Sequence, residues 1–363
     1  MENIPFLICP QAHDRYFSAE ILFRSVSSYI ASAAAEAGGE LFSPSGDTRS
    51  PYAEFFERFG EADRVLLFFL PCPAVSAAAL AELCARGAES PHLLVSSGRI
   101  AAVCGAPSLV REAELSGFPR IELPEDEAVI VCDPRSLLLA QRTLLDRMIC
   151  AHMERGVIFT DPASVLLSPD THIGAGTVVL PNCQFLGSTS VGEGCRIGPN
   201  SLLENARIGD RVQVNASQIF DSSVGEMTTV GPFAYIRPGC RIGSHARIGD
   251  FVELKNSAIG SGTKVSHLTY IGDSDLGERI NVGCGVVTVN YDGKIKQRCT
   301  VGDGSFIGCN VNLIAPVRIG SDAYIAAGST VTYDVPDGAL AIARQRQSVK
   351  PDWVKKRKES NRL

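Results

Sequence analysis

The chain has 363 residues, of which 45% are hydrophobic and 20% charged, a composition that excludes a disordered polypeptide and suits two domains. Its 34 basic and 40 acidic residues give a net charge of −6, which argues against broad nucleic-acid binding. Twelve cysteines lie between Cys9 and Cys309 without a Cys-x-x-Cys pair, which is typical of free thiols in the cytoplasm rather than of a disulfide framework or a zinc site. No signal peptide opens the chain, and prolines interrupt its longest uncharged stretch, so we expect a cytoplasmic protein without a membrane span.

Residues 1–155 alternate helical and strand-like segments, which predicts an α/β domain. We expect helices over 18–37, 74–86 and 134–154, the last with Asp133 as N-cap and Pro134 at its first position. Short apolar runs predict buried strands over 64–70, 92–95 and 128–132.

Residues 156–335 follow a different pattern, a six-residue repeat of aliphatic positions, often followed by glycine. Steps of six join Ile173, Val179, Phe185, Val191 and Ile197; Val224, Val230, Ile236, Ile242, Ile248 and Leu254; and Val301, Ile307, Leu313, Ile319, Ile325 and Val331. One inward aliphatic per short strand and turn predicts triangular coils that stack at the ~4.8 Å spacing of β-strands. Residues 336–363 would then form a C-terminal arm with a basic tail.

One segment breaks the repeat. Thr288 and Val301 are thirteen residues apart instead of six, so about seven residues around 290–296 should be extruded as a loop. A loop that serves no purpose in coil stacking is more often functional than not, although a tolerated surface insertion remains the alternative.

The repeat also predicts which residues lie above one another. Arg237 and Lys255 each follow an inward aliphatic and are eighteen residues apart, so they should stack one coil apart on one face. Stacked cations repel unless an anion lies between them, which indicates a phosphate site; two solvated surface cations are the alternative.

A second predicted column contains His267, Cys284, Cys309 and Ala327. Small side chains above a histidine would form a groove along the solenoid axis, suited to a long, thin ligand such as the pantetheine arm of coenzyme A. A neutral imidazole at its end could accept a proton from an amine near neutral pH. Asp250 falls one coil below His267 and could orient the ring, whereas an ordinary polar surface histidine is the alternative.

Several motifs together resemble one enzyme family. They are Asp250-Phe251-Val252-Glu253-Leu254-Lys255, His267-Leu268-Thr269-Tyr270, Asn290-Tyr291-Asp292-Gly293 and Ala339-Leu340-Ala341-Ile342-Ala343-Arg344. The chain resembles, over about residues 157–350, the bifunctional UDP-N-acetylglucosamine pyrophosphorylase/glucosamine-1-phosphate N-acetyltransferase family. This resemblance implies that the repeat is a left-handed parallel β-helix.

The resemblance also implies roles for individual residues. His267 would deprotonate the amine of glucosamine-1-phosphate for attack on acetyl-CoA, with no metal required. Arg237, Lys255 and Lys296 would surround the sugar phosphate, and Tyr270 and Asn281 would position the sugar. The acetyl-CoA site would be lined by Cys284, Asn290, Tyr291, Cys309, Ala327 and Arg344. The family acts as a homotrimer in which the C-terminal arm crosses to a neighbour.

The N-terminal domain departs from the family. It has no glycine before Gly38, where a nucleotide-binding loop would be expected, and Leu70-Pro71-Cys72-Pro73 stands where the family has a metal-binding Gly-Asp-x-Pro. Without a phosphate loop and a metal ligand, phosphoryl transfer loses its electrostatic catalysis. We therefore expect a truncated, degenerate Rossmann-like nucleotidyltransferase domain without pyrophosphorylase activity.

The sequence thus predicts an acetyl-CoA-dependent N-acetyltransferase of glucosamine-1-phosphate. Two alternatives remain open: an N-acetyltransferase for another amino sugar or sugar nucleotide, and a non-catalytic scaffold or regulator. A carbonic anhydrase on the same fold would need three converging histidines, and the columns of His172, His245 and His267 do not converge.

Overall fold

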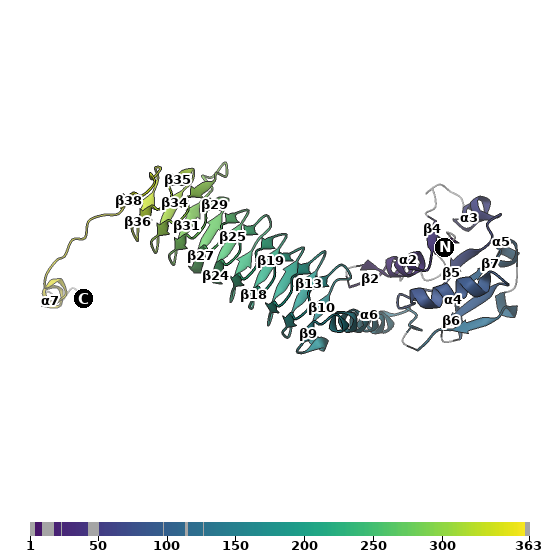
Figure 1. The fold of residues 1–363 in the computed structure, drawn as a ribbon. Helices are drawn as coiled ribbons and strands as arrows, with labels where there is room; N and C mark the ends of the chain where they lie inside the picture. The colour runs from purple at the N-terminus through teal and green to yellow at the C-terminus, as the bar shows by residue number, and fades with distance from the viewer. Residues whose placement is uncertain are drawn as a thin grey trace. The chain divides into compact units, whose positions relative to one another are not determined.

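The computed structural model describes residues 4–8, 18–22, 24–42, 51–96, 98–112, 115–125 and 127–359. The chain forms two compact units, one of Met1–Glu154 with Leu166–Pro169 and one of Arg155–Val165 with Asp170–Leu363 (Figure 1). Each unit has its own core and is described by itself.

The first unit contains a mixed six-stranded sheet in the order β4-β1-β5-β7-β6-β8. Strand β7 is antiparallel to β5 and β6, whereas β1 pairs in parallel with β4 and β5, and β6 with β8. The strands of this sheet are β1 (Ile4–Ile8), β4 (Gly39–Leu41), β5 (Val65–Phe68), β6 (His92–Ser96), β7 (Arg99–Gly105) and β8 (Arg120–Glu122).

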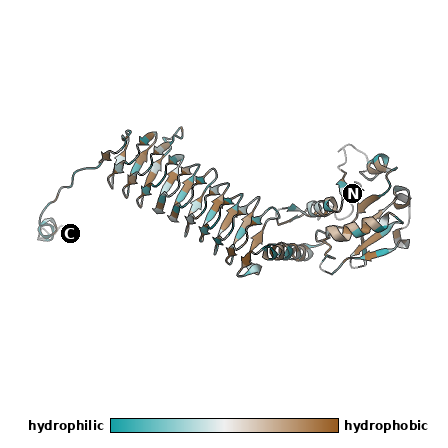
Figure 2. Ribbon diagram, viewed as in Figure 1, coloured by the Kyte–Doolittle hydropathy of each residue, from teal (hydrophilic) through white to brown (hydrophobic). Residues whose placement is uncertain are grey.

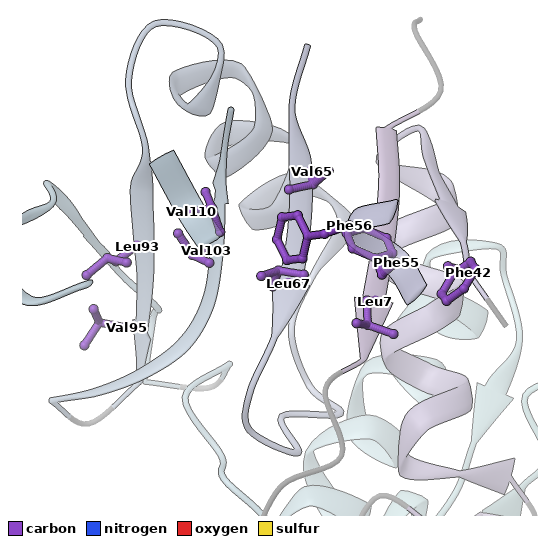
Figure 3. Close-up of a cluster of buried hydrophobic side chains, with 10 residues drawn as sticks. All are labelled: Leu7, Phe42, Phe55, Phe56, Val65, Leu67, Leu93, Val95, Val103 and Val110. Carbon is purple, nitrogen blue, oxygen red and sulfur yellow. The ribbon is translucent and has the colours of Figure 1, made fainter. Parts of the chain in front are cut away.

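Helices flank this sheet, and an aromatic cluster fills part of its core. The helices that pack on the sheet are α2 (Val26–Glu36), α3 (Pro51–Phe59), α4 (Ala77–Gly87) and α5 (Pro107–Glu112). Helix α6 (Pro134–Glu154) instead contacts β2 (Glu20–Ile21) and β10 (Leu166–Leu167); the other short elements are β3 (Arg24–Ser25) and η1 (Leu115–Gly117). Phe55 and Phe56 of α3 contact at 5.5 Å between ring centroids and pack with Leu7, Val65 and Leu67 of the central strands (Figure 3). Burial of such side chains supplies most of the driving force for folding.

The predicted helix over 18–37 is wrong at its start. Helix α2 begins only at Val26, because the Ser25 hydroxyl accepts a hydrogen bond from the Ser28 N–H at 3.2 Å and caps it there. The preceding residues form the β2–β3 pair. Helix α6, in contrast, has the predicted bounds, and Asp133 caps it through a 2.6 Å hydrogen bond from the Ser136 N–H.

The predicted strand over 128–132 is also wrong. Strand β6 has β7 and β8 as its neighbours, and residues 128–132 pair with no strand of this sheet. This segment is held instead by isolated bonds, from the Ser96 hydroxyl to the Ala128 carbonyl (2.8 Å) and from the Val131 N–H to the Pro71 carbonyl (2.9 Å).

The second unit is a parallel β-solenoid whose coils present three faces, each a ladder of very short strands (Figure 1). The first face contains β9 (Ile158–Phe159), β12 (Val178–Val179), β15 (Arg196–Ile197), β18 (Gln213–Val214), β21 (Thr229–Val230), β24 (Arg247–Asp250), β27 (Lys264–His267), β30 (Asn281–Val282), β33 (Phe306–Ile307), β36 (Tyr324–Ile325) and β38 (Leu340–Ala341). The second contains β13 (Gln184–Leu186), β16 (Leu202–Glu204), β19 (Gln218–Phe220), β22 (Tyr235–Ile236), β25 (Glu253–Lys255), β28 (Tyr270–Gly272), β31 (Val287–Val289), β34 (Asn312–Ile314) and β37 (Thr330–Val331). The third contains β11 (His172–Ile173), β14 (Ser190–Val191), β17 (Arg207–Ile208), β20 (Ser223–Val224), β23 (Arg241–Ile242), β26 (Ala258–Ile259), β29 (Ser274–Leu276), β32 (Cys299–Val301) and β35 (Val317–Ile319).

The six-residue period has a simple structural cause. Each short strand turns one aliphatic side chain inward, as Ile236, Leu254 and Ile271 illustrate on the second face, where each is at most 1% exposed. Figure 2 shows these hydrophobic positions recurring in every coil. Some coils are one residue shorter than three steps of six, since Ile242 pairs with Ile259 and Ile259 with Leu276.

The corners between faces require a left-handed backbone, and the sequence supplies residues that tolerate it. After the second face this corner is occupied in successive coils by Asn205, Asp221, Gly239, Asn256 and Asp273, all with φ between 41° and 84°. Asparagine and aspartate accept this conformation more readily than other side chains, and here they also bond along the corner, for example Asn205 Nδ2 to Asp221 Oδ1 at 3.0 Å.

The C-terminal arm leaves the solenoid after β38 and ends in helix α7 (Trp353–Glu359). This helix carries most of the predicted basic tail, and the Arg357 guanidinium lies 4.9 Å from the Trp353 ring centroid. Arg362, the last member of that tail, lies outside the described residues.

Candidate active site

The predicted column of His267 and small residues is present on the first face. The ladder pairs Val265 with Val282, Val282 with Ile307, and Ile307 with Ile325. The residues two positions further on therefore align in the order His267, Cys284, Cys309 and Ala327. Successive coils stack closely along this column. A Cβ at Gly283 would collide with the backbone of Cys309, and one at Gly308 with the backbone of Ala327.

His267 ends β27 and is paired in the ladder with Asp250 at the end of β24. Its Nδ1 is hydrogen-bonded to the Asp250 carboxylate, and this bond lowers the pKa of Asp250. An ionised carboxylate can only accept, so Nδ1 carries the proton and Nε2 presents a lone pair. Both side chains reach solvent, with 52% of His267 and 35% of Asp250 exposed.

The stacked cations lie on the second face. Arg237 follows β22 and Lys255 ends β25, one coil apart as predicted. Each also has a carboxylate of its own, since Arg237 Nη1 lies 2.9 Å from Glu253 Oε1 and Lys255 Nζ lies 3.1 Å from Asp273 Oδ2. The expectation that only an anion between the cations could relieve their repulsion is therefore incomplete.

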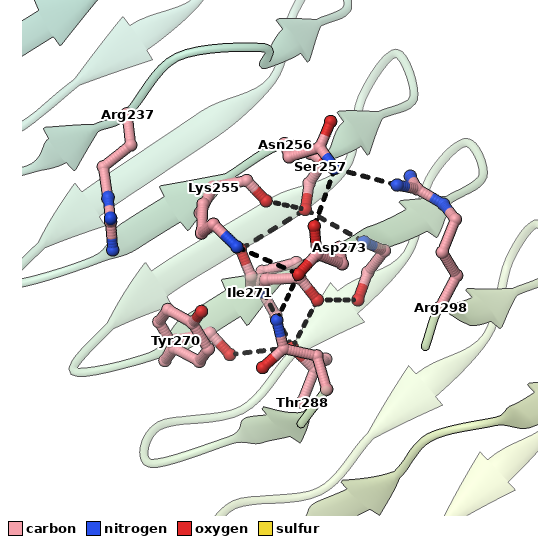
Figure 4. Close-up of polar contacts among 12 residues, drawn as sticks. Arg237, Lys255, Asn256, Ser257, Tyr270, Ile271, Asp273, Thr288 and Arg298 are labelled. Atoms are coloured by element: carbon pink, nitrogen blue, oxygen red, sulfur yellow. Dashed lines mark hydrogen bonds and ion pairs between the residues drawn. The ribbon is translucent and has the colours of Figure 1, made fainter. Parts of the chain in front are cut away.

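Asp273 organises this polar cluster (Figure 4). Its side chain is only 8% exposed and accepts hydrogen bonds from Lys255 Nζ, from Asn256 Nδ2 at 2.7 Å, and from Asn290 Nδ2. Burial by itself raises the pKa of Asp273, but the bonds from Asn256, Lys255 and Asn290 outweigh it and hold the pKa below the usual carboxyl value. The same carboxylate raises the pKa of Lys255, so both groups stay charged.

Tyr270 borders the cluster from β28. Its phenol lies across Gly272, where a Cβ would collide with it. Gly272 is the ladder partner of Lys255, so the missing side chain opens room for Tyr270 beside that lysine. Figure 4 shows the tyrosine below Lys255 in the same view.

The predicted extruded loop is present between β31 and β32, where Leu276 pairs with Val301 twenty-five residues later. It is compact: Tyr291 and Lys296 form an antiparallel bridge, and Asp292 Oδ1 accepts from the N–H groups of Lys294 and Ile295, both at 2.8 Å. Lys296 lies beside Lys255, whose ammonium lowers the pKa of Lys296. The cluster thus contains three cations and two carboxylates.

The other predicted site residues lie at several places around the two groups. Asn281 is on the first face between Lys264 and Phe306, not with the cations. Asn290 bonds Asp273 in the cation cluster, not in the histidine column. Tyr291 is exposed on the loop and donates its hydroxyl to the Gly293 carbonyl. Arg344 lies beside Gly328, next to the far end of the column.

One corner joins the histidine column to the cation cluster. Phe251 and Leu268 occupy it directly after Asp250 and His267, and both have the left-handed backbone at φ 54° and 45°. Such a backbone strains a bulky side chain, and both are more than half exposed. Phe251 also stacks on Phe233 of the preceding coil with ring centroids 5.4 Å apart.

Sequence reasoning missed Glu253, Asn256, Asp273 and Arg298. A signal for two of them was present, since Asn256 and Asp273 continue the Asn/Asp series of the corner after the second face. The contacts of Arg298 depend on how the loop folds back, which no periodicity encodes.

Among the residues that the structure describes, no group of three or more histidine, cysteine, aspartate or glutamate side chains could hold a metal ion. None of the helices in that part of the chain is both long and apolar enough to span a bilayer.

The chain is similar in sequence to a known family and to several known proteins. Residues 170–205, 221–256 and 298–333 match the family described as "Bacterial transferase hexapeptide (six repeats)". The chain is 49% identical over 250 residues to the bifunctional protein GlmU of Brevibacillus brevis, an alignment covering 68% of this chain and 54% of that protein. It is 50% identical over 232 residues to GlmU of Clostridium beijerinckii, covering 64% and 51%.

This chain belongs to the GlmU-like family. It spans about half the length of the curated relatives it matches. Residues 257–297, which carry His267 and the extruded loop, lie between two of the segments that match the hexapeptide repeat.

Two solved structures to which the chain is similar match it only weakly. The UDP-N-acetylglucosamine acyltransferase from Campylobacter jejuni is 18% identical with a TM-score of 0.29, covering 52% of this chain and 71% of that chain. The acetyltransferase domain of PglB from Neisseria gonorrhoeae, in complex with acetyl coenzyme A, is 10% identical with a TM-score of 0.21, covering 93% and 95%. Scores this low do not bear on function.

Proposed function

We propose that this chain transfers the acetyl group of acetyl-CoA to the amine of glucosamine-1-phosphate, giving N-acetylglucosamine-1-phosphate. The observation that carries the proposal is the His267–Asp250 pair, which lies across one corner from Arg237, Lys255 and Lys296. A base beside a cation cluster is what an amino-sugar phosphate requires.

In this proposal His267 Nε2 accepts a proton from the sugar amine as the nitrogen attacks the thioester carbonyl. The C–N bond forms, the C–S bond breaks, and His267 returns its proton to the departing thiolate. Asp250 holds the tautomer and stabilises the imidazolium that forms in between.

The phosphate of the acceptor would bind at Arg237, Lys255 and Lys296, with Tyr270 and Asn281 toward the sugar. The three cations face only two carboxylates, so a net positive charge remains to attract a phosphate. Asn281 is the ladder partner of Lys264 on β27, the strand that His267 ends, and this position is compatible with a contact to the sugar ring beside the amine.

The pantetheine arm would lie along Cys284, Cys309 and Ala327. Arg344, at the far end of that column, would then meet the phosphates of coenzyme A, and Asn290 and Tyr291 would border the entry. We propose that Cys284 and Cys309 act as small packing residues rather than nucleophiles, since no hydrogen bond among the described residues joins either thiol to a base.

We also propose that the active form is a homotrimer. Phe233, Phe251 and Leu268 form an exposed apolar column beside His267, and each is 56–59% exposed despite a strained backbone. Packing against a neighbouring copy would offset that strain and close the site from solvent. Sedimentation of wild type and Phe251→Ser tests this, with a loss of trimer expected only in the variant.

Uridylyl transfer, we propose, is absent. The segment after β5 packs Leu70 and Cys72 against Ala101, so buried apolar side chains stand where a magnesium carboxylate would be needed. The expected nucleotide loop falls in residues 9–17, outside the described residues. Release of pyrophosphate from UTP, magnesium and N-acetylglucosamine-1-phosphate would overturn this part of the proposal.

The direct test is thiol release from acetyl-CoA in the presence of glucosamine-1-phosphate. His267→Ala should lower the rate at least about 100-fold, the scale of a lost general base. His172→Ala, an exposed histidine on β11, should keep the wild-type rate. Wild-type protein without acceptor-dependent thiol release would refute the proposal and favour a scaffold. Faster turnover of a different amino sugar would refute the acceptor assignment alone.

A further inference from the structure

We infer that Arg298 and Asp275 are positioning residues, which clamp the base of the extruded loop and thereby hold Lys296 in the phosphate site. This inference rests on the proposed function, because it concerns how that function's acceptor site is held together. Neither residue touches the proposed substrate positions.

The clamp at Arg298 has three bonds. Arg298 Nε and Nη2 donate to the two carboxylate oxygens of Asp275 at 3.0 and 2.6 Å, and Nη1 donates to the Asn256 carbonyl at 3.1 Å. Exposed ion pairs contribute little when they are single contacts, but a two-pronged arginine–carboxylate pair with a third bond fixes geometry as well. The Asp275 carboxylate correspondingly raises the pKa of Arg298.

The other end of the loop is held independently. Asn290 donates to buried Asp273, and the Gln297 N–H donates to the Asn290 carbonyl at 2.9 Å. Residues 290 and 298 are therefore both tied to β29 and the corner before it, on one coil. The intervening residues form the compact loop that carries Lys296.

The two anchors converge on the residues that hold Lys255. Asn256 accepts from Arg298 through its carbonyl and donates to Asp273 through its amide, while Asp273 accepts from Lys255 (Figure 4). The loop thus approaches Lys255 from a fixed direction. Two ammonium groups side by side repel, so Lys296 would move away if the loop were released.

Only arginine fits the observed contacts. Lysine would keep the charge at 298 but could not donate to both oxygens of Asp275 and to the Asn256 carbonyl in one plane. The clamp therefore predicts that Arg298→Lys falls between wild type and Arg298→Gln in each measurement below.

The first experiment does not depend on any activity. Trypsin cleavage after Lys294 and Lys296 should accelerate at least about fivefold in Arg298→Gln and in Asp275→Asn, since a released loop opens more often. Arg318→Gln, an exposed arginine on the same face in β35, is the matched control and should be cleaved like wild type. Unchanged cleavage in both clamp variants would overturn the inference.

The second experiment measures kinetics on the same variants. The KM for glucosamine-1-phosphate should rise about tenfold, the scale of one charge-assisted hydrogen bond, whereas kcat and the KM for acetyl-CoA stay within about twofold. The Asp275→Asn/Arg298→Gln double variant should be no worse than either single variant. Equal changes in both KM values, or additive losses, would overturn the clamp. A wild type without turnover would refute the proposed function instead, and the cleavage result would still judge the clamp.

Discussion

Asp273 offers a test of how burial decides the strength of an ion pair. Its contact with Lys255 spans 3.1 Å with side chains 8% and 19% exposed, whereas Arg211 and Glu226 pair at 3.0 Å with side chains 53% and 47% exposed. The two contacts have nearly the same length on the same solenoid, so they differ in solvation and in the further bonds that Asp273 accepts from Asn256 and Asn290. Removing one partner of a buried pair leaves the other charge uncompensated, whereas an exposed pair contributes almost nothing.

Asp273→Ala should therefore cost about 3 kcal/mol, at the lower end for a broken buried pair because Lys255 keeps some access to water. For a unit of this size that loss lowers Tm by roughly 6–12 °C, whereas Glu226→Ala should lower it by less than about 3 °C. Thermal unfolding by circular dichroism measures both variants. If Asp273→Ala melts within about 2 °C of Glu226→Ala, burial does not strengthen this contact and the reasoning fails.

The same residue predicts a pH dependence. The folded pKa of Asp273 lies below the ordinary carboxyl value of about 3.9, so its contribution to stability is complete above that value and is lost as pH falls through the folded pKa. The Tm difference between wild type and Asp273→Asn should accordingly narrow below about pH 4 and stay constant from pH 5 to 8. A difference that widens on acidification would contradict the assignment.

Three further outcomes are expected. Asp250→Asn keeps an acceptor oxygen for His267 but not the charge, so it should lower kcat about tenfold with unchanged KM values. Asp250→Ala should lower kcat further, and an unchanged kcat in both variants would remove Asp250 from the mechanism. Iodoacetamide at pH 8, followed by mass spectrometry, should label the exposed Cys309 and Cys150 well before the buried Cys299 and Cys72, because burial raises the pKa values of these two thiols to about 11 and about 12. Acetyl-CoA should protect Cys309 from labelling but not Cys150, and equal protection of both would argue against the groove. Gly249→Ala should lower Tm by several degrees, because the new Cβ would collide with the Ser266 carbonyl in the next coil. At Gly117 a new Cβ meets open space, so Gly117→Ala should leave Tm unchanged. Equal Tm values for the two variants would mean that the coils can move apart at little cost.

Much of the solenoid could be predicted because its period is local. One inward aliphatic per six residues fixes the strand, the turn and the next coil together, so the spacing of Arg237 and Lys255 translated directly into a ladder position. The same arithmetic gave the column from His267 to Ala327 and the extruded loop. The α/β unit was less predictable, because Ser25 moved a helix start and because residues 128–132 are held by isolated hydrogen bonds rather than by a sheet partner.

The sequence by itself determined the solenoid, the stacked residues and the family, since all three depend on spacing and residue type along the chain. Only the tertiary structure decided which groups touch. It gave each stacked cation its own carboxylate, joined Asn290 to Asp273 instead of to the histidine column, and brought Arg298 back onto Asp275 and Asn256. The physical reason is that a periodic backbone fixes where side chains start, whereas their partners depend on side-chain reach and on how an irregular loop folds back over the coils.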